Sequence, residues 1–220
     1  MDDNRQYASR EYWEERFKNE EEFEWLADFS AFKHLILPNL RIDSRILHIG
    51  CGSSLMSMQL FDLGYRSITN VDYSEVLIGT KQRLYPEMKW ICDDIRSLDS
   101  IHSNSFDVVL EKATLEALLV TEKSPWSPSD AALETLESVM KSVVRVLTDD
   151  GIFISISFTQ PHFRVPALLR IPCWSVEVHE FGEHFRYFVY VMKCGKETAK
   201  DVKERYAHIA PEWSRTFIPS

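Results

Sequence analysis

The stretch Ile46–Ser54, with the sequence ILHIGCGSS, constrains the fold of this chain more than any other. Its first four residues are mainly apolar, and a run with helical spacing follows the two serines. This pattern predicts a buried strand that passes through a tight turn at Gly50 and Gly52 into a helix. Because glycine has no Cβ, the main chain there can approach a ligand closely, next to a helix N-terminus. Such a turn is typical of sites for nucleotide-like ligands, although G-x-G after a strand also occurs by chance.

Strand and helix patterns alternate along the chain, without an internal repeat or a low-complexity linker. Apolar runs predict strands at residues 45–49, 67–71, 89–92, 105–110, 152–158, 174–178 and 185–192. Helical spacing predicts helices at residues 9–37, 53–63, 74–85 and 129–147, with Ser74 as an N-cap. We expect a turn at Asp149–Gly151 and a weakly patterned tail from Lys196 onward.

The alternation predicts an α/β fold, because parallel strands need helical crossovers that cover both faces of the sheet. We expect a Rossmann-like, doubly wound sheet of seven strands, mostly parallel with an antiparallel strand near the C-terminus, and helices on both faces. In that architecture ligands bind beyond the carboxyl ends of the strands, where the strand order reverses.

Composition narrows the class of protein further. The formal charge of −9 argues against direct nucleic-acid binding, which usually needs a basic surface. The four cysteines are widely spaced, so neither a disulfide framework nor a metal site is expected. The N-terminus is charged throughout, and no apolar run approaches the length of a membrane span. We therefore expect a cytoplasmic protein that does not contact membranes.

Polar residues follow each of the predicted parallel strands. Asp72 comes about 20 residues after the glycine turn, where a carboxylate can accept hydrogen bonds from ribose hydroxyls. Asp93 and Asp94 follow the third strand, and either can meet an adenine amino group. Glu111 and Lys112 end the fourth strand, next to the position of a reacting group.

With these strand ends, the chain resembles the seven-strand S-adenosylmethionine-dependent methyltransferases over residues 10–193. Three motifs in order are similar to a narrower group, the eukaryotic methyltransferases that act on lysine of translation elongation factor 1-alpha. These motifs are YWEERF (Tyr12–Phe17), WLADFSAFKHLI (Trp25–Ile36) and FDVVLEKATLEALL (Phe106–Leu119). The resemblance implies one methyltransferase domain over residues 1–220, with an N-terminal helical lid (1–40), a catalytic core (41–195) and a tail (196–220).

The resemblance implies that S-adenosylmethionine is the cofactor and S-adenosylhomocysteine the product. Gly50 would contact the methionine portion of the cofactor, and Asp72 would hold the ribose hydroxyls. Tyr73 would stack beside the adenine, Asp94 would accept from its amino group, and Ile95 would add backbone and apolar contact.

The resemblance implies further cofactor contacts from the fourth strand and from the N-terminal region. Lys112 would reach the cofactor from the far side, unless it is a solvated lysine at the end of its strand. Trp13, Phe17 and Trp25 would form an N-terminal lid, although helix packing on the sheet explains their spacing as well.

The chain departs from the broad methyltransferase pattern at the glycine turn. His48 stands where an acidic residue usually helps to anchor the amino group of the cofactor, and Ser54 where a third glycine is common. We expect His48 to be a buried histidine with a hydrogen-bond partner. Ala113 replaces a glycine that is common in the narrower group.

The resemblance implies methyl transfer to a protein lysine, with translation elongation factor 1-alpha as the expected partner. The catalytic residue is left unassigned, and Glu111 and Glu116 are candidates to orient the amine. Three alternatives stay open: a small-molecule methyltransferase, a methyltransferase for another protein, and a catalytically silent binding module. A nicotinamide-dependent dehydrogenase is disfavoured because the third glycine of G-x-G-x-x-G is missing.

Overall fold

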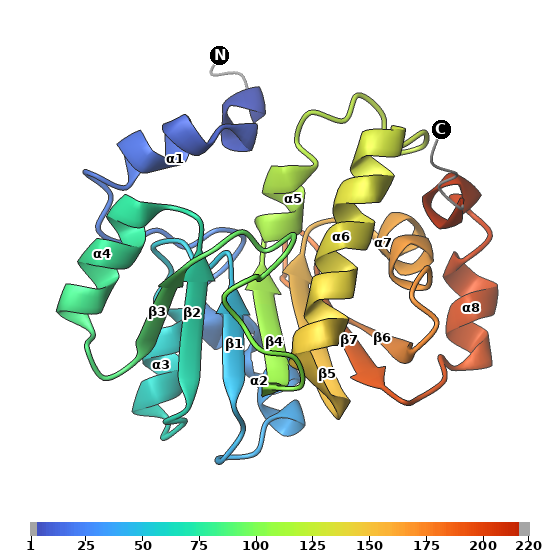
Figure 1. The fold of residues 1–220 in the computed structure, drawn as a ribbon. Coiled ribbons are helices and arrows are strands. Elements are labelled where there is room, and N and C mark those ends of the chain that lie inside the picture. Colours follow the sequence, from blue (N-terminus) through green and yellow to red (C-terminus); the bar gives the residue numbers. More distant parts are fainter. Residues whose placement is uncertain (1–3, 216–220) are drawn as a thin grey trace.

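The computed structural model describes residues 4–215, in which seven strands form one sheet (Figure 1). The strand order is β3-β2-β1-β4-β5-β7-β6, and β7 is antiparallel to both of its neighbours. The strands are β1 (Ile46–Ile49), β2 (Ile68–Asp72), β3 (Lys89–Cys92), β4 (Phe106–Lys112), β5 (Leu147–Ser157), β6 (Trp174–Phe181) and β7 (Tyr187–Cys194). The predicted sheet is confirmed, and β7 is its antiparallel strand.

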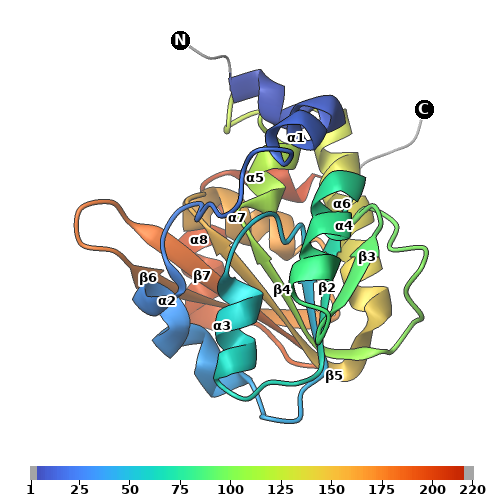
Figure 2. The same ribbon diagram turned by 90° about the vertical axis from the view of Figure 1, so that its left-hand side faces the viewer.

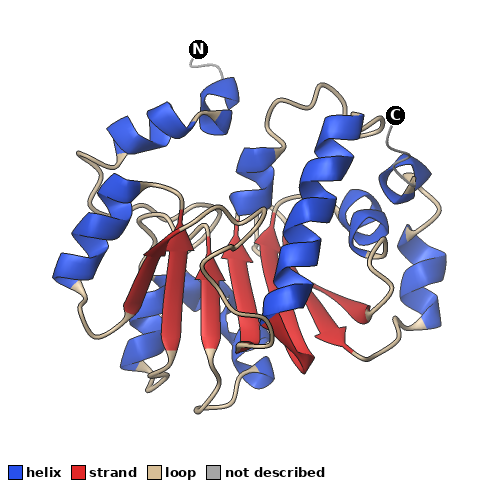
Figure 3. Ribbon diagram, viewed as in Figure 1, coloured by secondary structure: helices blue, strands red, loops and turns tan. Residues whose placement is uncertain are grey.

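Helices cover both faces of the sheet (Figures 2 and 3). The α-helices are α1 (Arg10–Arg16), α2 (Phe29–Ile36), α3 (Met56–Asp62), α4 (Glu75–Leu84), α5 (Thr114–Leu118), α6 (Asp130–Val146), α7 (Pro161–Leu168) and α8 (Lys200–Tyr206). Short 3-10 helices are η1 (Asn4–Ala8), η2 (Leu37–Asn39) and η3 (Pro211–Ser214). No helix in residues 4–215 is long and apolar enough to cross a membrane.

Two hydrophobic cores form because successive side chains of a strand point to opposite faces. One core lies between the sheet and helices α2, α3 and α4, and it includes Ile46 and Phe32. The other lies between the sheet and helices α6 and α7, and it includes Leu47 and Val143. The side chains of α6 that keep helical spacing in the sequence are the ones buried in this second core.

The N-terminal region differs from the continuous helix predicted over residues 9–37. Helices α1 and α2 form there, but residues 17–28 between them contain no regular helix. Leu26 has a φ of +67°, a left-handed conformation that a continuous right-handed helix does not allow. The aromatic spacing in this region therefore marks side chains that pack inward from a bent segment.

Two further expectations are corrected by the structure. Asp149–Gly151 lie within β5, where the register with β4 jumps from Leu147 to Ile152, so these residues bulge out of the strand. The tail is more ordered than its sequence pattern suggests, because α8 and η3 pack on the sheet domain. Trp213 of η3 is buried, and its indole donates a hydrogen bond to the carbonyl oxygen of Pro125 at 2.7 Å.

The strand order reverses between β1 and β4, since β1 connects toward β2 on one side and β4 toward β5 on the other. Helix α5 lies above the carboxyl end of β4, and helix α1 lies above α4 on the side of β2 and β3 (Figure 1). A crevice at this point is where parallel sheets bind their ligands.

Candidate functional site

A cavity of about 750 Å³ lies at the carboxyl ends of the central strands. This volume falls within the range of roughly 300–1,000 Å³ that is usual for small-molecule sites. All nine residues predicted to contact the cofactor line it: Trp13, Phe17, Trp25, Gly50, Asp72, Tyr73, Asp94, Ile95 and Lys112. The structure thus brings together residues from four strand ends and from the N-terminal region.

The glycine turn forms the centre of the cavity wall. Gly50 and Gly52 have φ values of +58° and +52°, which favour glycine at both positions. A Cβ on Gly50 would lie 2.2 Å from the Thr114 methyl carbon, so helix α5 can pack against this turn only where the side chain is absent. A Cβ on Gly52 would meet nothing within 4 Å, so the main chain there borders open space.

Asp72 is buried at the end of β2 and connects two turns. One carboxylate oxygen accepts a hydrogen bond from the Gly52 amide and the other from the Ser74 amide, each at 3.0 Å. Burial raises the pKa of Asp72 to about 6, although these two hydrogen bonds act in the opposite direction. The carboxylate has about four acceptor sites, so two remain for hydroxyl groups of a ligand.

Beyond β3, the two aspartates at the expected adenine position have different surroundings. Both carboxylate oxygens of Asp93 are used within its own turn, by the Asp94 amide and by Ser100. Asp94 is more open and forms an ion pair with Arg96, whose Nη2 lies 2.5 Å from Oδ2. The side chains of Tyr73 and Ile95 provide the flat and apolar surfaces of this part of the cavity.

The three N-terminal aromatic residues predicted as a lid lie against one another. Trp13 stacks on Phe17 with ring centroids 5.5 Å apart, and it meets Trp25 edge-on at 6.1 Å. The indole of Trp13 donates to the carbonyl oxygen of Tyr7 at 2.9 Å. This aromatic cluster lines the cavity on the side away from the sheet, where it can exclude water.

Lys112 at the end of β4 is held by the N-terminal region. Its side chain is 2% exposed, and Nζ lies 2.5 Å from a carboxylate oxygen of Glu24 and 2.8 Å from the carbonyl oxygen of Trp25. Burial lowers the pKa of Lys112, and the ion pair with Glu24 opposes that shift. The sequence did not identify Glu24, because no spacing rule links positions 24 and 112.

His48 is a buried histidine with a hydrogen-bond partner, as expected. Its Nδ1 lies 2.9 Å from the hydroxyl of Ser57, which donates in turn to Asn70 at 2.5 Å. Burial, together with the charge of Lys112, lowers the pKa of His48 to about 3, so the ring is neutral at physiological pH. The position therefore supplies no charge to the cavity.

A second pair of carboxylates, Glu111 of β4 and Glu116 of α5, lies at or next to the cavity. Glu111 is fully buried and accepts a hydrogen bond from Ser155, while burial and the nearby Glu116 raise the pKa of Glu111 to about 7. Glu116 lines the cavity and forms an ion pair with Arg164. One oxygen of Glu116 accepts from Arg164, Ser157 and Thr159. The other is buried and has no partner among the described residues.

Arg164 and Phe158 were not identified from the sequence. Arg164 belongs to α7, a short helix that contains Pro166 and shows no clear periodicity. Phe158 follows β5, lines the cavity and remains 48% exposed, which is unusual for a large aromatic side chain. A phenylalanine after a buried strand looks like one more core position, so the sequence carried no signal for this exposure.

The residues present fit S-adenosylmethionine. The open backbone at Gly52 allows close approach, and the neighbouring carboxylate of Asp72 retains acceptor sites for two ribose hydroxyls. Tyr73 and Ile95 would flank the adenine, and Lys112 retains one ammonium donor for a carboxylate group.

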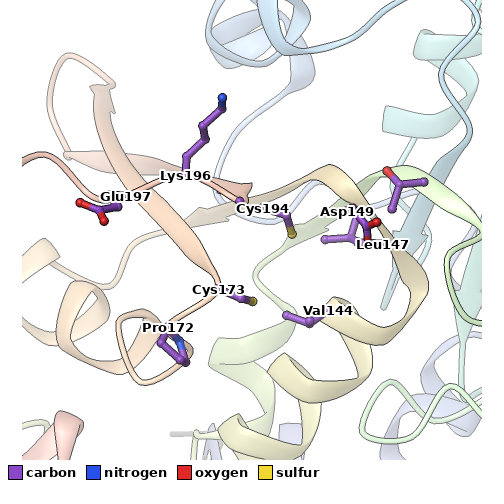
Figure 4. A pocket seen from close by; sticks show the side chains of 10 residues that line it. Val144, Leu147, Asp149, Pro172, Cys173, Cys194, Lys196 and Glu197 are labelled. Atoms are coloured by element: carbon purple, nitrogen blue, oxygen red, sulfur yellow. The ribbon is translucent and has the colours of Figure 1, made fainter.

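A smaller cavity of about 440 Å³ lies at the opposite end of the sheet (Figure 4). It is bordered by the end of α6 at Val144, by the start of β5, and by Cys173 and Cys194 near the β6–β7 pair. Burial raises the pKa of Cys194 to about 11, so its thiol stays protonated. None of the predicted cofactor residues lines this cavity.

The sequence is similar to known methyltransferases over most of its length. A family model described as a methyltransferase domain matches residues 47–155. EEF1A lysine methyltransferase 4 of Bos taurus is 39% identical over 198 residues, which are 87% of this chain and 77% of that protein. The Mus musculus protein of the same name is 38% identical over 88% of this chain and 78% of its own length.

A longer protein and a solved structure match at lower identity. The eEF1A lysine and N-terminal methyltransferase of Homo sapiens is 32% identical over 80% of this chain, which corresponds to 25% of that longer protein. The crystal structure of the N-methyltransferase NodS from Bradyrhizobium japonicum, in complex with S-adenosylhomocysteine, matches with a TM-score of 0.58 at 14% identity. The match covers 87% of this chain and all of NodS.

The two glycines of the turn are expected to respond differently to replacement by alanine. Gly52→Ala adds a left-handed alanine, which costs about 1–2 kcal/mol, and its Cβ projects into open space where it obstructs the cofactor. Gly50→Ala adds the clash with Thr114, which we expect to cost a further 1–3 kcal/mol or so. Urea unfolding of both variants measures the difference, and equal stabilities would contradict the role assigned to Thr114.

Cofactor affinity is expected to fall as the pH drops through about 6, because protonated Asp72 accepts fewer hydrogen bonds than the carboxylate. If only the ionised form binds, affinity for S-adenosylhomocysteine at about pH 5 is roughly tenfold weaker than at about pH 7.5. Calorimetric titration at both pH values measures this ratio.

Asp72→Asn is the control for this titration, since it should bind weakly and lose the pH dependence. The stability of the cofactor-free protein depends on pH in the opposite direction to the cofactor affinity. The folded pKa lies above the usual value, so the contribution of Asp72 to stability is present below about pH 4 and is lost as the pH rises through about 6. Equal affinity of the wild-type protein at both pH values would argue against the carboxylate as a ligand.

Proposed function

The chain belongs to the S-adenosylmethionine-dependent methyltransferase family that includes EEF1A lysine methyltransferase 4, and we propose that it methylates a lysine of translation elongation factor 1A. The names of the relatives support the elongation factor as the substrate. A cytoplasmic location, where translation takes place, is part of the same proposal.

The observation that supports an amine as the group that receives the methyl is the second oxygen of Glu116, which is unpaired in the described part of the chain. Arg164 and two hydroxyls fix one side of this carboxylate, and its second oxygen is a buried acceptor without a partner among the described residues. A buried acceptor that lacks a hydrogen bond is unfavourable by about 1–3 kcal/mol, which a donor on the substrate would recover. An amine can supply that donor, whereas an acceptor group with a carboxylate would be repelled.

Phe158 supplies the other wall at this end of the cavity. Its exposed ring can pack along the apolar stem of a lysine side chain, as lysine commonly buries its methylenes against apolar surface. Leu118 and Val120, which follow Glu116 closely in the sequence, also line the cavity. Aromatic and apolar walls around one carboxylate are therefore complementary to a long side chain that ends in an amine.

S-adenosylmethionine, when bound, supplies a methyl group carried on a cationic sulfur. The contribution of the protein is then mainly proximity and alignment. A lysine amine with its ordinary pKa of about 10.4 is charged at pH 7, and reaching the neutral form costs roughly 4–5 kcal/mol. The amine therefore loses its proton to solvent before it enters the cavity. There the aromatic cluster of Trp13, Phe17 and Trp25 can exclude water on one side, which favours the neutral amine. Glu116 then accepts a hydrogen bond from the amine and orients its lone pair.

The wild-type protein is expected to transfer a radiolabelled methyl group from S-adenosylmethionine to recombinant elongation factor 1A. Mass spectrometry of the product should find the label on one lysine, and replacing that lysine by arginine should abolish labelling. Because the proposal names a protein acceptor, labelling confined to small metabolites of a cell lysate would contradict it.

Glu116→Gln is expected to lower kcat/KM for the protein acceptor by about 10- to 100-fold, the usual effect of losing a hydrogen bond to a charged group. The affinity for S-adenosylhomocysteine should stay at the wild-type value, because the change lies at the acceptor end. Glu134→Gln, on the exposed face of α6, is the matched control and should match the wild type in both measurements. Unchanged kcat/KM in Glu116→Gln would remove Glu116 from the acceptor site.

A further inference from the structure

Lys112 is a buried cation whose counter-charge comes from outside the sheet. Its Nζ lies 2.5 Å from Glu24, which precedes it by 88 positions. His48, on the neighbouring strand β1, is neutral and cannot balance the charge. Asp28 is the other acidic group that acts on Lys112, and it belongs to the same N-terminal region. The central lysine of the cavity therefore depends on the N-terminal region for its electrostatic balance.

Glu24 also contacts the glycine turn. One carboxylate oxygen accepts from the Leu55 amide at 2.7 Å, and both accept from the hydroxyl of Ser54 at 3.0–3.1 Å. Its side chain is only 19% exposed. A single carboxylate thus joins the end of β4 to the start of α3, the two elements that flank the centre of the cavity.

Main-chain contacts hold the same region in place. We call residues 18–28 the strap, since they contain no regular helix between α1 and α2 and contact Lys112 at the end of β4 and Ser54 after β1. Lys112 donates to the carbonyl oxygen of Trp25 at 2.8 Å. Lys81 of α4, which is also buried, donates to the carbonyl oxygens of Glu21 and Ser53 at 3.3 Å. Two buried lysines from different elements therefore bind the strap at two points, Glu21 and Trp25.

The arrangement leaves Lys112 with one donor for a ligand. An ammonium group has three N–H donors, and Glu24 and Trp25 use two of them. These two contacts fix the direction of the third. Lys112 lines the cavity, so its remaining donor is available to an anionic group such as the cofactor carboxylate.

We propose that Glu24 is a positioning residue for cofactor binding. It acts through Lys112, whose free donor it orients, while the hydrogen bonds from Ser54 and Leu55 hold the Glu24 carboxylate itself in place. The cofactor site is therefore complete only while the strap keeps these contacts. The strap, which has no regular secondary structure, supplies the negative charge of Glu24 next to Lys112, where the sheet has none.

Glu24→Gln tests this proposal, with Glu22→Gln as the matched control on the exposed side of the same strap. Affinity for S-adenosylhomocysteine, measured by calorimetry, should fall about tenfold or more in Glu24→Gln, as expected for loss of a charged hydrogen-bond partner. Amide hydrogen exchange of residues 18–28 in the cofactor-free protein should become faster. Glu22→Gln should match the wild type in both measurements.

A double variant distinguishes positioning from general fastening. If Glu24 acts through Lys112, Glu24→Gln should change the affinity much less in a Lys112→Gln background than in the wild type. Equal effects in the two backgrounds would overturn the proposal. So would a Glu24→Gln variant that exchanges faster in the strap but binds the cofactor like the wild type.

A conservative variant keeps the test valid if Glu24→Gln does not fold. Glu24→Asp keeps the charge with a shorter reach, so its affinity should lie between those of the wild type and the glutamine variant. Suppose that Glu24→Asp binds the cofactor like the wild type and that Glu24→Gln/Lys112→Gln folds normally. The exact placement of this charge would then be irrelevant, and the proposal would be overturned. None of these measurements depends on the identity of the methyl acceptor.

Discussion

The buried carboxylate of Asp72 holds together the two turns on which the site is built. A charged group in the interior is tolerated only where hydrogen bonds compensate its loss of water. Here the amide of Gly52 supplies one such bond and the amide of Ser74 the other, so the turn after β1 and the turn after β2 are fixed to a common point. The group expected to bind the ribose is thus also a structural link. One carboxylate thus organises both turns of the cavity wall.

The sequence predicted the sheet and the cavity centre well because their signals are local. Apolar runs of four to seven residues mark strands such as β4, and glycine at a left-handed turn has a direct conformational cause. The carboxyl ends of parallel strands meet at one edge of the sheet, so Asp72, Asp94 and Lys112 had to lie near one another whatever the details of packing. All three line the cavity.

The parts that could not be predicted depend on contacts between distant residues. The aromatic spacing over residues 9–37 resembles that of a helix. The left-handed conformation of Leu26 and the hydrogen bonds from Lys81 and Lys112 instead bend the chain into the strap. The glutamates of this region look like a solvated acidic face in the sequence. Glu14 instead caps the start of α4 through Ser74, and Glu24 pairs with Lys112. Some of the acidic residues that give the net charge of −9 therefore make internal contacts.

The N-terminal contacts have a consequence for the order in which the protein assembles during synthesis. Glu14 and Glu24 leave the ribosome before their partners, because Ser74 and Lys112 emerge 60 and 88 residues later. This segment, with its several aromatic rings, stays without these partners until β4 has been completed and has joined the sheet. The segment around Glu14 and Glu24 is thus the last part of the cavity wall to settle, and a bound ligand indicates that the central strands have already assembled.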